Sequence, residues 1–100
     1  MSNNLLIHIP ENMRDRISVT EEGFVRCGET ATHYIDVLPM LFNDRIVTTN
    51  KSMPSTYDRY WCYRKGGAAL IAALAWDGSE DTEPVGWKKS WDQRYQPEND

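Results

Sequence analysis

The sequence lacks most of the features that identify common classes of protein. Its 100 residues include only two cysteines, Cys27 and Cys62, and no apolar run long enough to span a bilayer. Two cysteines cannot build a disulfide framework, and the short apolar runs exclude a membrane-spanning helix. The first residues also lack the basic and apolar regions of a secretory signal. We therefore expect a cytoplasmic protein with reduced thiols and no membrane contact.

Positive charge is also in short supply. The chain has 11 Lys and Arg residues against 15 Asp and Glu residues, a formal net charge of −4, which opposes simple binding along nucleic-acid phosphates. The charges are unevenly spread: residues 51–65 hold four basic residues and one acid, and residues 77–83 hold four acids and no base. Neighbouring patches of opposite sign suit contact with a protein partner, and they also keep a chain soluble.

Motifs for metal binding and catalysis are missing as well. The soft metal ligands of the chain are His8, Cys27, His33 and Cys62. They form none of the closely spaced pairs that mark a structural zinc site, so we expect no metal and no cofactor. A nucleophilic pair of Cys62 and His33 would need a carboxylate, which Asp36 or Asp44 could supply. These single residues have no local signature, and we expect no enzymatic activity.

Two stretches resemble ligand loops only in part. In "DGSEDTE" (77–83) oxygen-bearing side chains alternate as in a calcium loop, but Thr82 stands where that loop needs glycine and Lys88 where it needs glutamate. We interpret it as a solvated acidic turn. In "RKGGAAL" two basic residues and two glycines precede a helix, where they could hold an anion on backbone N–H groups or only turn the chain. We favour the turn. The residues of this candidate anion site are Arg64, Lys65, Gly66 and Gly67.

Alternating apolar residues bounded by Gly and Pro predict several short strands. They span residues 5–9, 16–20, 24–27 and 57–63. The last of these, "YDRYWCY", has large rings on both faces and predicts a central strand covered on both sides. Residues 33–42 fit either a strand or a helix, and Pro39 indicates an edge strand or a bulge. Asn43 and Asp44, between "MLF" and "RIVTT", predict a hairpin turn.

One helix is expected. The Ala-rich stretch from about 66 to 77 is apolar nearly all round, with Leu70 and Leu74 one turn apart, which predicts a buried helix ended by Gly78. Strands around one helix indicate a small α+β fold, with a mostly antiparallel sheet and the helix packed on one face. We expect one globular domain over residues 1–100, with the last residues, about 96–100, frayed.

The stretch "GWKKSWDQRY" (86–95) interleaves aromatic and basic residues. It favours a strand or an irregular tail, and we expect its aromatic side chains to be exposed. Tyr, Trp and Arg are favoured in protein interfaces. The predicted partner-binding residues are Trp87, Trp91, Arg94 and Tyr95. The same pattern is typical of proteins that bind single-stranded nucleic acid, which makes nucleic acid the alternative partner.

The order of three segments resembles that of a known family. The segments are "VLPMLFNDRIVTT", "YDRYWCY" and "ALIAALAWDGSEDTEPVGWKK". Over about residues 37–89 the chain is similar to small proteins of actinobacterial phages, mycobacteriophages in particular. In that family a Trp-Cys-Tyr segment, an Ala-rich helix ending in Trp-Asp-Gly, and a Pro-x-Gly-Trp segment recur in this order. The ending "SWDQRYQPEND" departs from the short turn and basic end that are more usual there.

The resemblance implies no established activity and no functional residues. It implies a phage accessory protein that acts in the cytoplasm of a bacterial host. With the features above, we expect a non-enzymatic module that binds a host or phage protein, or a second copy of itself as a homo-oligomer. Nucleic-acid binding through residues 86–95 is the alternative. The sequence leaves open whether Cys27 and Cys62 lie close together.

Overall fold

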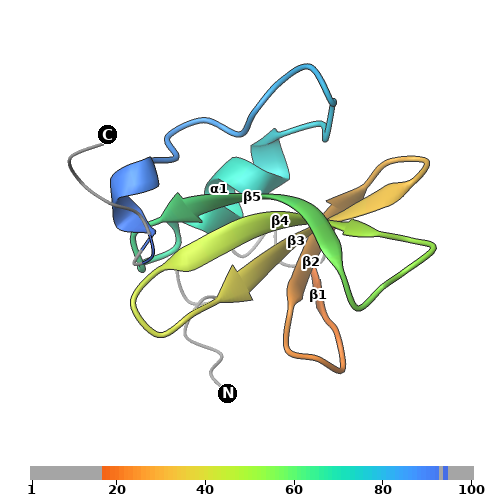
Figure 1. Ribbon diagram of the computed structural model, residues 1–100, viewed down its shortest axis with the longest axis horizontal. Helices are drawn as coiled ribbons and strands as arrows, with labels where there is room; N and C mark the ends of the chain where they lie inside the picture. The colour runs from red at the N-terminus through yellow and green to blue at the C-terminus, as the bar shows by residue number, and fades with distance from the viewer. Residues whose placement is uncertain (1–16, 93, 95–100) are drawn as a thin grey trace.

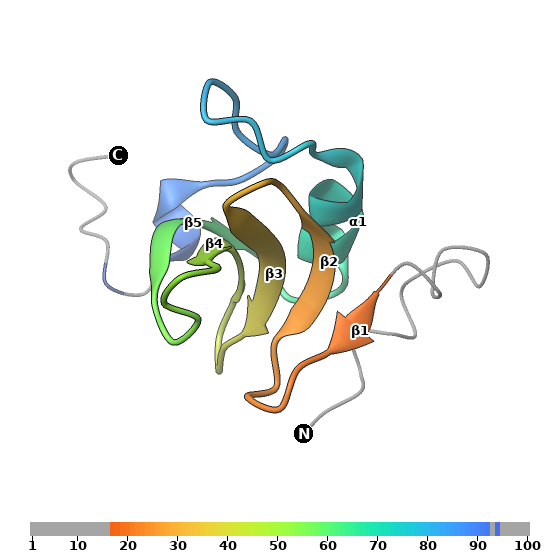
Figure 2. The same cartoon turned by 90° about the vertical axis from the view of Figure 1, so that its right-hand side faces the viewer.

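The computed structural model describes residues 17–92 and 94 (Figure 1). These residues form a five-stranded antiparallel sheet in which each strand pairs with its neighbours in sequence, and one helix lies against one face of it (Figure 2). The predicted α+β class is confirmed. The strand expected at 5–9, the end expected at 96–100 and Tyr95 lie outside the described residues.

The sheet has the strand order β1-β2-β3-β4-β5. The strands are β1 (Ser18–Val19), β2 (Val25–Glu29), β3 (His33–Pro39), β4 (Asp44–Asn50) and β5 (Tyr57–Tyr63). The helix α1 (Ala68–Ala75) and one 3-10 turn, η3 (Lys89–Trp91), follow. β3 pairs with β4 along its whole length, from His33 opposite Asn50 to Pro39 opposite Asp44. Residues 33–39 are therefore a strand and not a helix.

The core lies between α1 and the sheet. β-branched and aromatic side chains alternate along the strands, so that one face of the sheet turns them toward the helix. The core residues are Val25, Cys27, Ile35, Val37, Ile46, Trp61 and Tyr63 of the sheet, with Ala69, Leu70, Ala72, Ala73 and Leu74 of the helix. The small alanines let the helix approach the sheet closely, and the two leucines fill the space between them.

The helix is shorter at both ends than the sequence predicts. Gly66 and Gly67 precede it with φ values of 125° and 99°, in the left-handed region that favours glycine. The prediction that Gly78 ends the helix is wrong, because the helix ends three residues earlier. Gly78 has a φ of 81° and lies against the β2–β3 turn, where a Cβ would stand 2.6 Å from Thr30 Cγ2. Close approach, rather than helix capping, accounts for this glycine.

The face of the sheet opposite α1 is polar. Arg26 donates to both carboxylate oxygens of Asp36, at 2.9 and 3.1 Å, and Thr49 Oγ1 donates to the same carboxylate at 2.8 Å. Asp36 is fully buried, so these hydrogen bonds and the charge of Arg26 offset its lost hydration. Cys62 lies on this face and Cys27 lies in the core. The two cysteines form no disulfide.

β5 is an edge strand, and not the central strand that its aromatic residues predicted. Its neighbour β4 is an interior strand, and the residues of β4 from Asp44 to Thr49 are all buried. The sequence did not predict the interior position of β4, because the strand carries charged and hydroxyl side chains. These side chains are buried with hydrogen-bond partners rather than in apolar contacts. The prediction that Pro39 marks an edge strand or a bulge is also wrong, because β3 lies between β2 and β4 and pairs with β4 in regular register up to Pro39. Pro39 is the last residue of β3, where its missing N–H interrupts no ladder.

The hairpin between β3 and β4 turns two residues earlier than predicted. The Met40 N–H donates to the Asn43 carbonyl at 2.9 Å, which places Leu41 and Phe42 at the turn. Asn43 and Asp44, the expected turn residues, are buried. The predicted turn is therefore wrong, because these two polar side chains bond to other parts of the chain.

A β-bulge lies at the start of β5. The pairing with β4 shifts between Thr48 and Thr49, which leaves Asp58 as the extra residue. The strict alternation predicted for β5 is therefore wrong at its start. Tyr57 joins Tyr60 on the polar face, where the two rings meet edge-on with centroids 6.2 Å apart. Because of the bulge, Asp58 has no partner on β4 and does not follow the alternation of side chains between the two faces.

Candidate functional site

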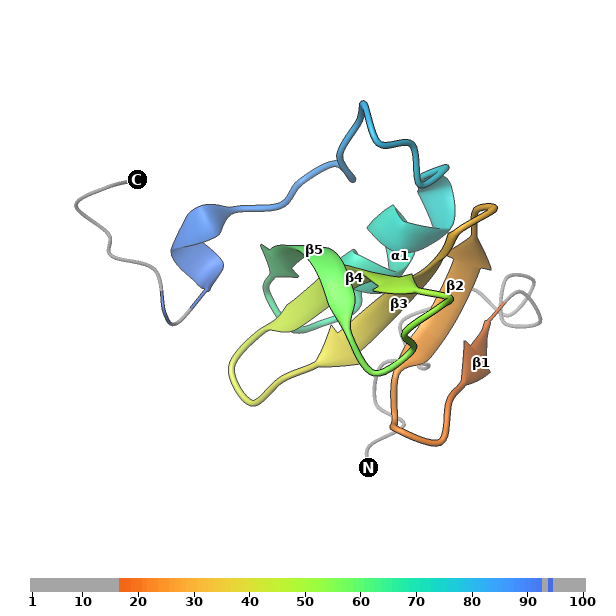
Figure 3. The same ribbon diagram turned by 45° about the vertical axis from the view of Figure 1, so that its right-hand side comes forward.

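The turn between β3 and β4 presents two large apolar side chains to solvent. Leu41 is 77% exposed and Phe42 is 70% exposed, and they lie where the hairpin projects from one end of the sheet (Figure 3). We call this pair the hairpin tip. Neither residue has a positive φ, so this turn accepts most residue types and does not itself require two large apolar side chains. Exposed large apolar side chains that the fold does not use are typical of a protein–protein contact.

The base of the hairpin tip is held on both sides. Lys65 Nζ donates to the Met40 carbonyl at 2.7 Å and to Asp44 Oδ1 at 2.8 Å. Asn43 Nδ2 donates to the carbonyl of Trp91, which joins the other side of the turn to η3. A partner would therefore meet a turn that is already ordered, so binding would lose little conformational entropy.

The predicted partner-binding residues contact the chain itself. In the C-terminal segment (83–92), Trp87 is half-buried against the core. Trp91 is also half-buried, with the Arg64 guanidinium 5.5 Å from its ring centroid. Arg94, just beyond this segment, is exposed. The expectation of exposed aromatic side chains is therefore wrong for both tryptophans, and their role in binding stays a prediction.

Asp92 fixes the C-terminal segment to the sheet. Its carboxylate accepts hydrogen bonds from Arg45 Nη2 at 3.1 Å and from the Tyr60 hydroxyl at 2.6 Å. Burial alone would raise the pKa of Asp92. Hydrogen bonds from Tyr60 and Arg94 and the charge of Arg45 outweigh burial and lower the pKa to about 2. The carboxylate is therefore ionised at neutral pH and pairs with a buried arginine of β4.

Four residues form the candidate anion site: Arg64, Lys65, Gly66 and Gly67. Lys65 is bonded to Asp44, and Arg64 lies over the ring of Trp91. Both glycines have positive φ and reverse the chain between β5 and α1. These contacts favour the turn over an anion site.

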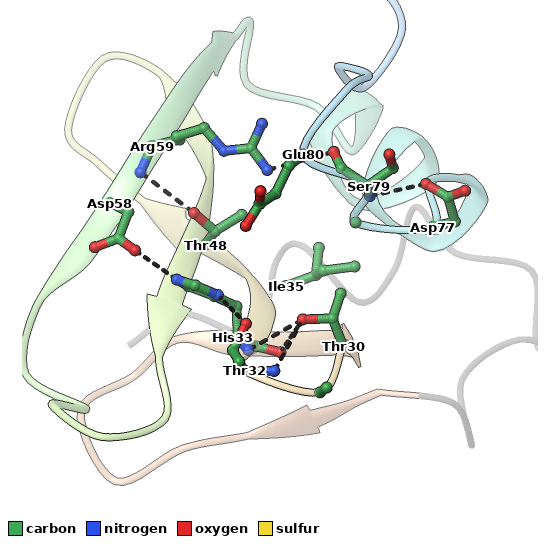
Figure 4. Close-up of a pocket in the computed structure, with 12 residues that line it drawn as sticks. Thr30, Thr32, His33, Ile35, Thr48, Asp58, Arg59, Asp77, Ser79 and Glu80 are labelled. Atoms are coloured by element: carbon green, nitrogen blue, oxygen red, sulfur yellow. Dashed lines mark hydrogen bonds and ion pairs between the residues drawn. The ribbon is translucent and has the colours of Figure 1, made fainter.

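A polar pocket of about 560 Å³ opens beside the bulge of β5 (Figure 4). It is lined by Thr30, Ala31, Thr32, His33, Ile35, Thr48, Asp58, Arg59, Asp77, Gly78, Ser79 and Glu80. His33 Nε2 is hydrogen-bonded to Asp58 Oδ2, and Thr32 Oγ1 lies 2.8 Å from His33 Nδ1. The row of hydroxyl, imidazole and carboxylate has the order of a nucleophile, a base and an orienting acid.

The surroundings of this row do not favour catalysis. The backbone N–H groups of Thr32 and His33 both donate to Thr30 Oγ1, at 3.3 and 3.1 Å, so neither is available to stabilise an oxyanion. The geometry favours a structural role, in which His33 and Asp58 join the β2–β3 turn to β5.

The other candidates for a nucleophile or a metal site are buried or already hydrogen-bonded within the chain. Cys62 is 2% exposed, and burial raises its pKa to about 11, so its thiol is protonated and unreactive at neutral pH. In the acidic turn, Asp77 accepts from the Ser79 N–H at 2.9 Å, and Ser79 Oγ accepts from the Asp81 N–H at 3.1 Å. Over residues 17–92 and 94, no three His, Cys, Asp or Glu side chains cluster as metal ligands.

Half of the basic residues in the stretch 51–65 are paired with acids. Lys51 forms an ion pair with Glu29 at 2.9 Å, and Lys65 forms one with Asp44 at 2.8 Å. Arg59 donates to the Ser79 carbonyl at 3.4 Å, and Arg64 lies over the ring of Trp91. A protein that binds nucleic acid needs a row of exposed basic groups along the phosphates. The arrangement therefore favours a protein partner over nucleic acid.

Sequence analysis missed the hairpin tip. It placed the turn at Asn43 and Asp44, which assigned Leu41 and Phe42 to a strand or helix. The available signal was Pro39, which ends β3 and leaves the next apolar residues outside a strand.

Comparison with known proteins gave no match, whether with family models, curated proteins or solved structures. The resemblance to a phage family therefore stays a prediction. In the part of the chain that the structure describes, no helix combines the length and the apolar character needed to cross a bilayer.

Proposed function

We propose that the chain is a non-enzymatic protein-binding module whose contact is the hairpin tip, Leu41 and Phe42. The partner is another protein, with an apolar pocket that takes up these side chains. The observation that carries this proposal is the exposure of two adjacent large apolar side chains at the turn of the β3–β4 hairpin. Adjacent apolar side chains that a fold leaves in solvent are expected at surfaces that bind another protein.

The resemblance to phage proteins suggests where this partner occurs. On that basis the chain is a phage accessory protein, and its partner is a host or phage protein in the cytoplasm of the bacterial host. Burial of a leucine or phenylalanine side chain stabilises a complex by about 1.5–3 kcal/mol each. After the cost of association, a two-residue contact of this kind fits a transient complex.

Affinity capture from a lysate of the bacterial host tests the proposal. Wild-type chain is compared with a Leu41→Ser, Phe42→Ser variant, and the captured proteins are identified by mass spectrometry. We expect at least one protein that the wild type retains and the variant loses. Met53→Ser is the matched control, because Met53 is 59% exposed in the β4–β5 loop, and it should retain that protein. The purified partner should bind the double variant about 100-fold more weakly.

Three outcomes would contradict the proposal. One is equal capture by the wild type and the hairpin-tip variant. Another is salt-sensitive binding of DNA, followed by tryptophan fluorescence at low and high salt, which would support the nucleic-acid alternative. The third is a dimer of the wild-type chain that the hairpin-tip variant loses, since the partner would then be a second copy.

A further inference from the structure

Arg59 supplies a guanidinium group to the polar pocket beside the bulge of β5. Its side chain extends from β5 toward the turn that carries Ser79 and Glu80 (Figure 4), and its Nη2 donates to the Ser79 carbonyl at 3.4 Å. The guanidinium carbon lies 5.0 Å from the ring centroid of Trp61 and 5.4 Å from that of Trp76. These contacts hold the group in place, while most of its five N–H donors stay free.

The acidic side chains of the pocket differ in what they contact. Asp58 is hydrogen-bonded to His33, and Asp77 accepts a backbone N–H of its own turn at 2.9 Å. Glu80 is exposed, and among the described residues it has no hydrogen-bond or ion-pair partner. Arg59 forms no ion pair with any described residue either, although it lines the same pocket. The pocket therefore offers both an unpaired cation and an unpaired carboxylate to a ligand.

Thr48 adds a second hydrogen-bond donor next to Arg59. It is only 3% exposed, and its Oγ1 accepts the backbone N–H of Arg59 at 3.2 Å. No described residue accepts the hydrogen of this hydroxyl, and a buried donor without an acceptor costs free energy. A carboxylate has two oxygens that accept hydrogen bonds, so it can bind the guanidinium and the hydroxyl together.

We propose that this pocket binds a free α-amino acid, whose carboxylate contacts Arg59 and Thr48 and whose ammonium group contacts Glu80. A ligand with negative charge alone would meet three carboxylates of the lining, and one with positive charge alone would meet the guanidinium. Like charges placed together weaken binding. An α-amino acid carries both charges on one carbon, so each charge meets a group of opposite sign. The volume of about 560 Å³ lies in the range of small-molecule sites.

The pocket is separate from the hairpin tip. It is lined by His33 at the start of β3, whereas the hairpin tip follows Pro39 at the end of the same strand. The two surfaces therefore lie at opposite ends of β3, and a ligand in the pocket leaves the hairpin tip free for a protein partner.

NMR spectra of the ¹⁵N-labelled chain, titrated with each of the twenty amino acids up to about 10 mM, test this proposal. We expect at least one amino acid to shift the amide signals of Thr48, Ser79 and Glu80. Two analogues with the same side chain are then compared with it, the amine without the carboxylate and the acid without the amino group. Each should bind at least about tenfold more weakly, because each loses one set of charge-assisted hydrogen bonds.

Variants of the chain place the ligand in this pocket. Arg59→Gln and Glu80→Gln should each weaken binding at least about fivefold. Asp81→Asn is the matched control, because Asp81 belongs to the same turn and does not line the pocket, and it should change binding less than about twofold. Glu80 is exposed and has no described partner. Glu80→Gln therefore keeps the test decisive even if Arg59→Gln destabilises the fold.

Four results would overturn the proposal. They are the absence of shifts with every amino acid, equal binding of either analogue, unchanged binding by Glu80→Gln, and loss of binding in the Leu41→Ser, Phe42→Ser variant. We expect that last variant to bind the amino acid as the wild type does, even if the proposed function of the hairpin tip fails.

Discussion

The hairpin tip and the C-terminal segment (83–92) both carry large apolar side chains, but the chain uses them in opposite ways. Leu41 and Phe42 are more than two-thirds exposed, on a turn that is held from below. Trp87 and Trp91 are half-buried and hold the C-terminal segment against the body of the protein. Aromatic content in a sequence therefore does not predict exposure. Exposure follows from whether a side chain has a surface of the same fold to pack against.

The largest expected effect comes from releasing the C-terminal segment. Arg45→Ala leaves Asp92 without its buried partner, with only the exposed Arg94 still paired to it, and loss of one partner of a buried ion pair costs about 3–5 kcal/mol. Urea unfolding followed by tryptophan fluorescence measures the free energy of unfolding. Arg94→Ala is the control, because Arg94 is exposed and should cost less than about 1 kcal/mol. Equal effects of the two variants would show that the buried pair does not hold this segment.

A substitution in the core provides a reference for the stability effects in both regions. Leu74 is 6% exposed in the contact between α1 and the sheet, so Leu74→Ala should lower the free energy of unfolding by about 2–5 kcal/mol. The exposed helix residue Ile71 provides the control, since Ile71→Ala removes a side chain that is 51% exposed. A cost below about 1 kcal/mol for Leu74→Ala would place this residue at the surface and contradict the packing described.

Acid should loosen the C-terminal segment before it affects the hairpin tip. The pKa of Asp92 is lowered from 3.8 to about 2 in the folded chain. A carboxyl whose folded pKa is depressed contributes stability above its unfolded pKa. That contribution is lost as the pH falls from about 4 to about 2. Urea unfolding at a series of pH values should show a steeper loss over this range for the wild type than for Asp92→Asn. Parallel curves would contradict the ionised role of Asp92.

The smallest effect on stability is expected at the hairpin tip. Leu41→Ser and Phe42→Ser remove side chains that the fold leaves in solvent. Exposed substitutions of this kind usually change the free energy of unfolding by less than about 0.5 kcal/mol. Thermal unfolding of the double variant should therefore match the wild type. A clear loss of stability would mean that these side chains serve the fold rather than a partner.

Local patterns predicted much of the fold. Period-two alternation identified β2 and β5, and the Ala-rich run identified α1. Positions set by distant contacts were not predicted, such as the interior place of β4, whose Asp44 and Arg45 are buried against Lys65 and Asp92. The two residues of each ion pair lie far apart in the sequence, so a local pattern of residues does not reveal that they meet.

The candidate site was harder to predict from the sequence than the fold. Trp87 and Trp91 were predicted to bind a partner because they are large and lie among basic residues, yet both are partly buried. The hairpin tip depends on where a turn falls, and a shift of two residues changed Leu41 and Phe42 from strand residues to exposed turn residues. Turn position is decided by the hydrogen bonds of Asn43 and Asp44 to the rest of the chain.

The most direct test of the central claim is the affinity of a purified partner, once captured, for three forms of the chain. Isothermal titration would compare the wild type with the Leu41→Ser, Phe42→Ser variant and with Arg94→Ala. The account predicts about 100-fold weaker binding for the hairpin-tip variant and a change below about twofold for Arg94→Ala. The reverse pattern, with binding lost in Arg94→Ala and kept in the hairpin-tip variant, would contradict it.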